Sequence, residues 1–307
     1  MPRSTFAFDW QGQSCFCRVS GERDLATAEP LLTIHPIGVG LSGAFWQRFT
    51  RAWKERGLEE AHPLIHPDLL GCGRSAMPDR PLRPQDWAQP LARLLDQGGG
   101  RPVWLLAQGA SLPVALELQA LRPEAVRGLV LFGPPSWKVM TAQADERLSA
   151  ALWRGFFHTP LGNLFYRYAR TERFLHSFSR KELFARELPV DHEWLTMLRE
   201  GSRDPASRHA VFSFLAGFWR RDYGPLLRSL PCPVLVLFGE EASGISRRGR
   251  GDTPTTKAED YGRELPRSRV RILPGRNVLP WESTEAVVEE VAAWIEAGGP
   301  TGPEPHR

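Results

Sequence analysis

Short runs of apolar residues alternate along the chain with longer segments in which apolar positions recur at helical spacing. Runs of about four to eight residues rich in Val, Ile and Leu are typical of strands that are buried on both faces of a parallel sheet. Such runs occupy residues 31–36, 63–67, 102–108, 128–133, 233–238 and 269–273. Helical spacing marks residues 44–55, 84–96, 110–121 and 283–297. The alternation predicts an α/β fold with a mostly parallel, doubly wound sheet.

Two segments depart from this alternation. Residues 5–10 and 14–19 largely alternate apolar with polar positions and flank the turn-forming pair Gln11 and Gly12, which predicts an antiparallel hairpin at the sheet edge. Between residues 140 and 223 the pattern is helical, and aromatic residues such as Trp153 and Phe165 interleave with arginines. We expect this insertion to form a helical lid over the carboxyl edge of the sheet, where folds of this kind keep their sites.

The domain organisation follows from these patterns. Residues 1–139 and 224–297 are predicted to form one α/β core, and residues 140–223 the lid. The last segment, 298–307, is rich in Pro and Gly and is predicted to be disordered. A chain of 307 residues with 42% hydrophobic residues can bury a sizeable core, which excludes wholesale disorder.

Charge and cysteine content narrow the function classes. The net charge of +4 is spread along the chain, so no nucleic-acid partner is predicted. No window offers the roughly 18 uncharged apolar residues of a membrane span, and the N-terminus lacks the apolar core of a signal peptide. Cys15, Cys17, Cys72 and Cys232 lack metal-site spacing, so we expect a reduced, cytoplasmic protein without a metal. No cofactor is predicted either, because Gly71 and Gly73 lack the Gly-Lys-Ser/Thr that completes a phosphate-binding loop.

Four local motifs carry a resemblance. They are His35-Pro-Ile-Gly38 after the third predicted strand, Asp68-Leu-Leu-Gly-Cys-Gly-Arg-Ser75, Pro233-Val-Leu-Val-Leu-Phe-Gly239, and Leu273-Pro-Gly-Arg-Asn-Val-Leu-Pro-Trp-Glu282. With these motifs the chain resembles the α/β-hydrolase family, from the N-terminal hairpin to the last helix. The resemblance implies the α/β-hydrolase fold. It also implies an oxyanion turn at His35–Gly38, a catalytic acid after residue 239 and a catalytic histidine within residues 273–282.

The resemblance does not extend to the catalytic residues. The family's nucleophile lies in a G-x-S-x-G turn between a strand and a helix. The corresponding segment, counted without gaps from Pro102, is Ala107-Gln-Gly-Ala-Ser111, which places Gly109 at the nucleophile position. Ala242 stands where the acid is expected and Asn277 where the histidine is expected. Asparagine cannot take up a proton near pH 7, so nucleophile, base and orienting acid are all missing from these positions.

Residues near these positions have competing interpretations. Ser111 would be the nearest hydroxyl, but a helix-capping role is favoured because no histidine is placed to activate it. His35 is interpreted first as a structural hydrogen-bonding residue. Glu240 and Glu241 are interpreted as solvated charges.

A binding function remains open to this arrangement. Backbone N–H groups of Ile37 or Gly38 and of Ala110 would bind an anion or a carbonyl oxygen, and a glycine at position 109 would open the pocket floor. His35, Ile37, Gly38, Gly109, Ala110, Ser111 and Asn277 are therefore the predicted ligand-binding residues. Arg247, Arg248 and Arg250 form a second candidate, an anion site, against the alternative of a solvated loop.

The sequence thus predicts a non-catalytic member of the α/β-hydrolase family that binds a small hydrophobic or anionic molecule, or a protein partner. Two alternatives stay open. One is an esterase-like hydrolase that uses a relocated nucleophile such as Ser111, or chemistry without a triad. The other is peripheral contact with a membrane through the aromatic and arginine-rich lid.

Overall fold

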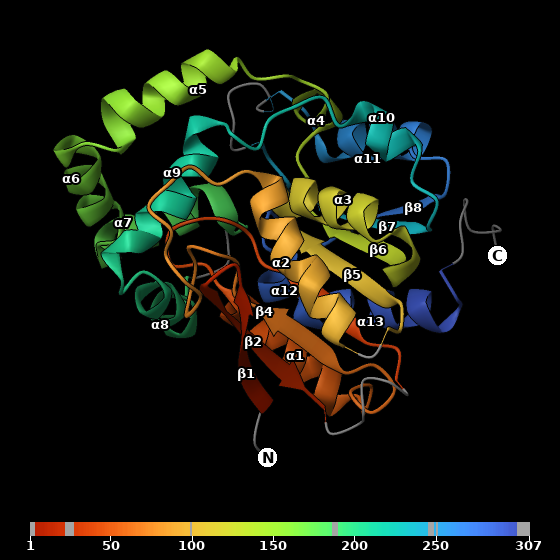
Figure 1. The fold of residues 1–307 in the computed structure, drawn as a ribbon. Helices are drawn as coiled ribbons and strands as arrows, with labels where there is room; N and C mark the ends of the chain where they lie inside the picture. The colour runs from red at the N-terminus through yellow and green to blue at the C-terminus, as the bar shows by residue number, and fades with distance from the viewer. Residues whose placement is uncertain are drawn as a thin grey trace.

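An eight-stranded sheet forms the centre of the protein in the computed structural model, which describes residues 4–21, 28–98, 100–185, 190–244, 249 and 251–299 (Figure 1). The strands are β1 (Ser4–Trp10), β2 (Gln13–Ser20), β3 (Leu31–Ile34), β4 (Leu64–Pro67), β5 (Val103–Gln108), β6 (Val126–Phe132), β7 (Val234–Gly239) and β8 (Ser268–Leu273). Their order in the sheet is β1-β2-β4-β3-β5-β6-β7-β8. Strand β2 pairs antiparallel with β1 and β4, and every later pair is parallel. The predicted fold class is confirmed.

The N-terminal hairpin lies at the sheet edge, as predicted. Its turn has positive φ at both Gln11 (51°) and Gly12 (76°), the backbone that a two-residue turn needs to match the twist of the flanking strands. On β2, Cys15 and Cys17 are both buried, because alternate residues of a strand share one face.

Helices cover both faces of the sheet. They are α1 (Gln47–Glu55), α2 (Pro84–Gln97), α3 (Leu112–Leu121), α4 (Trp137–Met140), α5 (Glu146–Leu152), α6 (Pro160–Ala169), α7 (Glu172–Phe178), α8 (His192–Gly201), α9 (Arg208–Ala216), α10 (Gly224–Arg228), α11 (Pro254–Glu264), α12 (Leu279–Glu282) and α13 (Thr284–Glu296). Shorter turns are the 3-10 helices Gly43–Trp46, Gly109–Ser111, Pro123–Ala125 and Pro205–Ser207, and the π-helices Trp153–Phe157 and Ser179–Leu183.

The central strands separate two apolar layers. On β5, Leu105 and Ala107 pack in one cluster with residues of α2 and α3, while Trp104 and Leu106 pack in another with residues of α1, α12 and α13. Both sets are buried, which explains why the sequence of this strand is continuously apolar rather than alternating.

Helices α5 to α9 lie together at one side of the molecule and belong to the segment 140–223, here called the lid (Figure 1). Part of the lid has a small core of its own, which includes Trp153, Tyr166 and Phe212. Helix α8 instead packs in the apolar layer that contains α1, α12 and α13, here called the main core. There Trp194 packs edge-on against Phe184 and Trp281. The exact limits 140 and 223 stay a prediction.

The loop Asp68–Ser75 shows why its motif needs two glycines. Gly71 and Gly73 have positive φ of 80° and 56°, and a Cβ added at Gly73 would lie 2.2 Å from an Asp68 carboxylate oxygen. That carboxylate accepts hydrogen bonds from the N–H groups of Gly43 and Arg74, at 2.7 and 2.8 Å. The motif therefore fixes a buried turn beside the carboxyl ends of β3 and β4.

Residues 300–307 of the predicted tail lie outside the described residues. Its first two residues, Gly298 and Gly299, donate backbone hydrogen bonds to the carbonyls of Ile295 and Trp294 and so complete the end of α13.

Candidate functional site

A sharp turn at Gly109 joins β5 to the helical residues that lead into α3. Gly109 has φ of 58°, a left-handed conformation that is costly for other residues. A Cβ added there would meet no atom within 4 Å. The strand, turn and helix are thus arranged as in a nucleophile elbow, with free space where a side chain would project. We call Gln108, Gly109 and Ala110 the elbow.

The loops that follow β7 and β8 converge on the elbow. The side-chain amide of Gln108 donates to the backbone carbonyl of Asn277 at 2.8 Å, and the N–H of Ser243 donates to Oδ1 of Asn277 at 3.2 Å. Through these neighbours the structure brings the three predicted positions, Gly109, Ala242 and Asn277, to one place at the carboxyl edge of the sheet. Their equivalence to a catalytic triad stays a prediction.

Asn277 also fastens the lid to the core. Its Nδ2 donates to the carbonyl of Glu182 at 2.6 Å, and its backbone N–H donates to the carbonyl of Leu183 at 3.0 Å. With Oδ1 accepting from Ser243, both ends of the side-chain amide are engaged. Sequence reasoning did not find Glu182 or Ser243, because they contact Asn277 across 95 and 34 positions of the chain.

Arg276 and Glu282 strengthen the same junction. The Arg276 guanidinium donates to Oγ of Ser243 and, at 2.6 Å, to the carbonyl of Lys181 in the lid. The Glu282 carboxylate accepts from the backbone N–H of Arg276 at 2.8 Å and from that of Ala185. Burial raises the pKa of Glu282, and these hydrogen bonds oppose that effect. The loop after β8 therefore serves as an attachment point for residues 181–185.

The position of Ala242 has a buried amine beside it rather than a carboxylate. Lys257 of α11 is 4% exposed, and its Nζ lies 3.5 Å from the carbonyl oxygen of Ala242. Burial lowers the pKa of Lys257, while the charge of Asp252 raises it. Glu240 and Glu241 are exposed. Arg247, Arg248 and Arg250, the predicted anion site, lie outside the described residues.

Ser111 and His35 are both buried and hydrogen-bonded to the backbone. Oγ of Ser111 donates to the carbonyl of Gln108 at 2.9 Å, the back-bonding arrangement of a helix start. Nε2 of His35 accepts from the N–H of Leu69 at 3.0 Å, and its Nδ1 lies 2.8 Å from the carbonyl of Pro36. These partners require a neutral ring protonated on Nδ1, and burial lowers the pKa of His35, which favours the same form.

The loop after His35 carries the predicted backbone donors. The N–H groups of Ile37 and Gly38 donate to no other residue of the described part of the chain, and the third predicted donor, Ala110, lies in the 3-10 helix Gly109–Ser111. Directly beyond, Gly40 packs against lid helix α8, since a Cβ at Gly40 would lie 1.9 Å from the carbonyl oxygen of Leu198. The lid therefore touches the core backbone at this loop as well as at Asn277.

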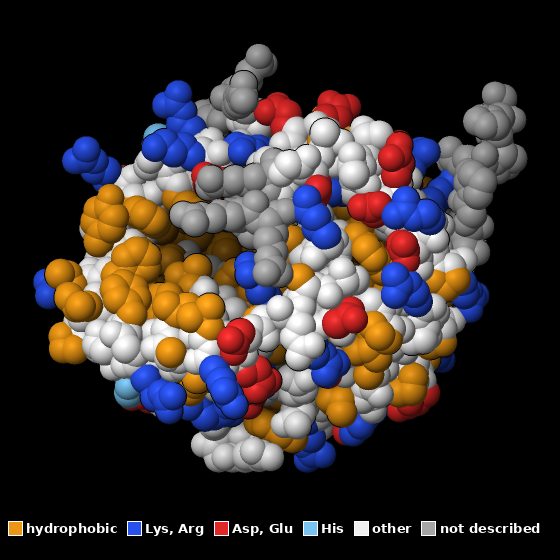
Figure 2. All heavy atoms as spheres, turned by 90° about the horizontal axis from the view of Figure 1, so that it is seen from above, with side chains coloured by type: hydrophobic (Ala, Val, Ile, Leu, Met, Phe, Trp, Pro, Cys, Tyr) orange, Lys and Arg blue, Asp and Glu red, His pale blue; other side chains and the backbone are white. Residues whose placement is uncertain are grey.

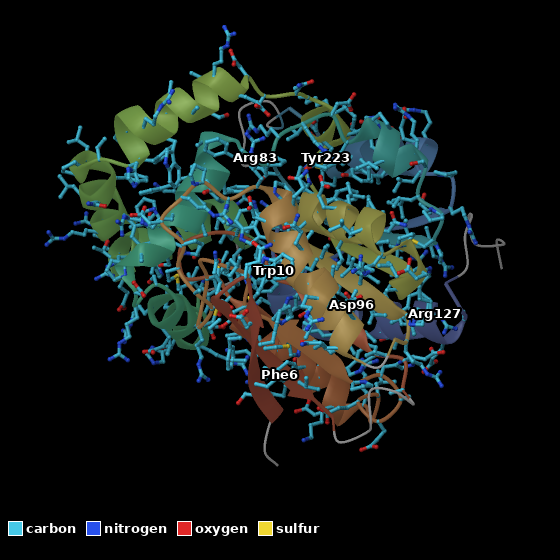
Figure 3. The ribbon with its side chains drawn as sticks, viewed as in Figure 1. Phe6, Trp10, Arg83, Asp96, Arg127 and Tyr223 are labelled. Carbon is cyan, nitrogen blue, oxygen red and sulfur yellow. The ribbon has the colours of Figure 1, made fainter. Side chains whose placement is uncertain are left out.

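A hollow of about 140 Å³ lies elsewhere, between the start of α2 and lid residues. Arg83 and Tyr223, labelled in Figure 3, are among the residues that line it. Neither residue was predicted to bind a ligand, and none of the predicted ligand-binding residues lines this hollow.

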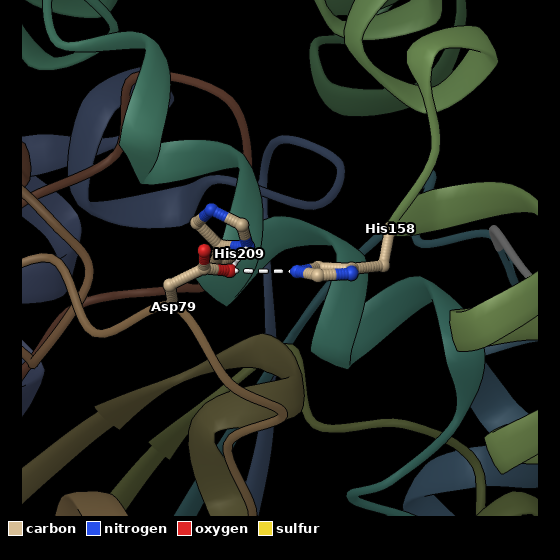
Figure 4. A group of neighbouring side chains, drawn as sticks. All are labelled: Asp79, His158 and His209. Atoms are coloured by element: carbon tan, nitrogen blue, oxygen red, sulfur yellow. Dashed lines mark hydrogen bonds and ion pairs between the residues drawn. The ribbon is translucent and has the colours of Figure 1, made fainter.

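A second cluster of polar side chains joins the core to the lid (Figure 4). One carboxylate oxygen of Asp79 lies 2.9 Å from Nε2 of His158 and 3.2 Å from Nδ1 of His209. The hydrogen bond with His158 lowers the pKa of Asp79, and burial lowers that of His209. Sequence reasoning missed this cluster because the three residues show no short-range spacing.

Proteins named as hydrolases are similar to this chain in sequence. A haloalkane dehalogenase from Bradyrhizobium diazoefficiens is 26% identical over 311 residues, which cover 92% of this chain and 91% of that protein. The lipase LipV from Mycobacterium tuberculosis is 36% identical over 113 residues, so the chain spans only 36% of that relative's length, with 34% of its own.

Solved structures share the fold. A serine hydrolase involved in carbazole degradation superposes with a TM-score of 0.73 at 15% identity, covering 96% of this chain and 100% of the other. An esterase from Thermogutta terrifontis gives 0.71 at 19% identity, covering 97% and 100%. Among the described residues, none of the helices combines the length and the apolar composition needed to cross a membrane. The model of the alpha/beta hydrolase family matches residues 31–291, and the chain belongs to that family.

Proposed function

We propose that this protein is a non-catalytic member of the alpha/beta hydrolase family that binds a small hydrophobic or anionic molecule at the elbow. The observation that carries the proposal is the pair Gly109 and Asn277. A glycine with open space above it occupies the turn, and an asparagine whose amide is held by Glu182 and Ser243 occupies the loop after β8.

The chemistry of a Ser-His-Asp triad has no support among the described residues. A serine becomes nucleophilic when an imidazole within about 3 Å accepts its proton. Among the described residues, Thr33 and Thr50 lie beside His66, and Thr196 lies beside His192. At the elbow, Oγ of Ser111 donates to a backbone carbonyl and contacts no histidine of the described residues.

The backbone N–H groups at and near the elbow are suited to binding a ligand. The N–H groups of Ile37 and Gly38 have no acceptor among the described residues, and Ala110 lies at a helix start, where N–H groups attract anions and carbonyl oxygens. A ligand with a carboxylate or carbonyl head and an apolar body matches these donors and the apolar core behind them. A protein partner that inserts such a group would use the same features.

The competing function is an esterase-like hydrolase that uses a relocated nucleophile. Ser111 is 0% exposed, and its Oγ donates to Gln108 rather than to a base. Those contacts favour a structural role for Ser111. Because similar proteins are named as hydrolases, the esterase-like function still needs a direct test.

Fluorophosphonate labelling followed by intact-mass measurement separates the two functions. The reagent forms a covalent adduct with an activated serine. We expect no adduct under conditions that label a known serine hydrolase completely. An adduct mapped to any single serine would contradict the proposal and identify the nucleophile.

Ligand binding is tested by thermal stabilisation with octanoate, which joins a carboxylate to an apolar chain. Stabilisation of the wild type should disappear in Gly109→Leu, because leucine fills the space above the elbow. The matched control is Gly57→Leu, since Gly57 also has positive φ, 71°, and no atom within 4 Å of an added Cβ. Equal stabilisation in both variants would place the ligand elsewhere.

An exposed apolar face on the lid favours a second role, contact with an anionic membrane surface. Leu161, Leu164 and Tyr168 recur on one side of α6 and are 62, 62 and 59% exposed. Leu148 on α5 adds to this face at 59%. Figure 2 shows a broad area of hydrophobic side chains bordered by basic ones, the composition of an interfacial helix surface.

Vesicle sedimentation tests this role. Vesicles with phosphatidylserine should bind the protein more strongly than phosphatidylcholine alone, and added salt should weaken the binding. The double variant Leu161→Ser/Leu164→Ser should lose it. Leu121→Ser is the control, because Leu121 is 40% exposed at the end of α3, outside the lid. Binding that survives the double variant would contradict a role for this face.

A further inference from the structure

The cluster of Asp79, His158 and His209 has the composition of a metal site. Asp79 comes from the core loop before α2, His158 follows the π-helix Trp153–Phe157, and His209 lies in the first turn of α9 (Figure 4). We propose that these three side chains bind one divalent transition-metal ion, of which zinc is the representative. The proposal is independent of the function proposed for the elbow.

The donor atoms have the separations that one ion requires. Zinc lies about 2.0 to 2.2 Å from imidazole nitrogens and carboxylate oxygens, so two ligand atoms at the tetrahedral angle are about 3.3 Å apart. Oδ1 of Asp79 lies 2.9 Å from Nε2 of His158 and 3.2 Å from Nδ1 of His209. All three donor atoms lie within 4.8 Å of one another. Small side-chain movements would therefore complete the geometry.

The donor types select the class of ion. Two imidazole nitrogens and one carboxylate oxygen suit zinc and neighbouring transition metals, whereas calcium and magnesium prefer oxygen ligands alone. Three protein ligands leave a further coordination position for water. The side chains of Asp79 and His158 are 65 and 49% exposed, so water can reach that position.

Aromatic packing holds the two imidazoles in place. The Trp153 ring stacks on His158 with centroids 5.9 Å apart and an interplanar angle of 20°. The same indole lies 6.0 Å from the His209 ring, whose side chain is only 3% exposed. Rings held in this way lose less conformational entropy when they bind an ion.

A bound ion would link the lid to the core. His158 and His209 belong to the lid, whereas Asp79 belongs to the loop that continues from the Asp68–Ser75 motif. Ion binding would stabilise the folded protein, because the three residues come together only in the folded chain.

The test uses protein prepared without a polyhistidine tag and treated with a chelator. Titration calorimetry with Zn²⁺ should give one site per chain, and Zn²⁺ should raise the thermal midpoint until a chelator is added. Asp79→Asn and His158→Ala change exposed side chains, and each should lower the Zn²⁺ affinity more than about tenfold. His176→Ala is the matched control, because His176 is an exposed lid histidine on α7.

Two results would overturn the proposal. One is the absence of stoichiometric Zn²⁺ binding by the wild type, which would leave the cluster as hydrogen bonds alone. The other is an affinity that falls equally in His176→Ala and His158→Ala, which would show that exposed histidines bind the ion nonspecifically.

Discussion

Alanine substitutions at Gly109 and Gly40 provide a matched measurement of the free space at the elbow. Both glycines have positive φ, 58° and 76°. A left-handed backbone costs an alanine about 1 to 2 kcal/mol in either position. The difference between the free energies of unfolding of the two variants therefore reports which atoms the added methyl group contacts.

The structure predicts that this difference is large. The methyl of Gly109→Ala meets no atom within 4 Å, so only the backbone cost applies. The methyl of Gly40→Ala would lie 1.9 Å from the carbonyl oxygen of Leu198. Overpacking of this kind adds about 1 to 3 kcal/mol. We expect the free energy of unfolding to fall by about 1 to 2 kcal/mol for Gly109→Ala and about 2 to 5 kcal/mol for Gly40→Ala.

Urea unfolding followed by tryptophan fluorescence and circular dichroism measures both losses. Agreement between the two signals and equal denaturant slopes would justify comparing the free energies. Gly57→Ala, with open surroundings and φ of 71°, should match Gly109→Ala. If Gly109→Ala instead loses as much as Gly40→Ala, the space above the elbow is filled, and the proposed binding site lacks its main support.

Three further predictions concern His35, Asn277 and Trp194. Burial lowers the pKa of His35 below its ordinary 6.5, so its contribution to stability is present above about pH 6.5 and is lost as the pH falls towards the folded-state pKa. The free energy of unfolding should therefore fall less steeply between about pH 7.5 and 5.5 in His35→Gln than in the wild type, and equal slopes would contradict this assignment. Asn277→Ala should cost about 1 to 3 kcal/mol and speed proteolysis within the lid, because it leaves the Glu182 carbonyl without its donor, whereas Asn163→Ala on exposed α6 should do neither. Trp194→Ala should cost about 3 to 5 kcal/mol in the same unfolding assay, because Trp194 is fully buried and donates to Oγ of Ser179 at 2.8 Å; a loss below 1 kcal/mol would show that α8 is not part of the main core.

Strands β3 to β7 could be predicted from sequence because nearly all of their residues are buried and their sequences are largely apolar. Predicted and observed strand limits differ by at most two residues, as for β6 at its start, Val126. Helix α11 was not predicted, since Lys257 and Tyr261 are its buried residues and the rest of its sequence is mostly polar. A helix with only two buried residues shows too little periodicity to be recognised.

Part of the candidate site could also be predicted from local sequence, and part depends on the tertiary fold. The place of Gly109 could be counted along a continuous strand and turn, so local sequence was enough. The hydrogen bonds that hold Asn277 could not be predicted, because they depend on how the lid packs against the core. Asp79, His158 and His209 likewise come together only through the tertiary fold.

The hydrogen bonds between Asn277 and the lid limit which substitutions position 277 can accept. A catalytic histidine has to exchange protons, so its ring nitrogens must face a nucleophile and an acid. Here the side chain at position 277 is held by a lid carbonyl and the N–H of Ser243. A single Asn277→His change would give up this attachment before any catalytic gain could appear. If position 277 corresponds to the family's catalytic histidine, as we propose, triad hydrolysis in this chain would require a new way to hold residues 181–185, as well as a serine and an acid.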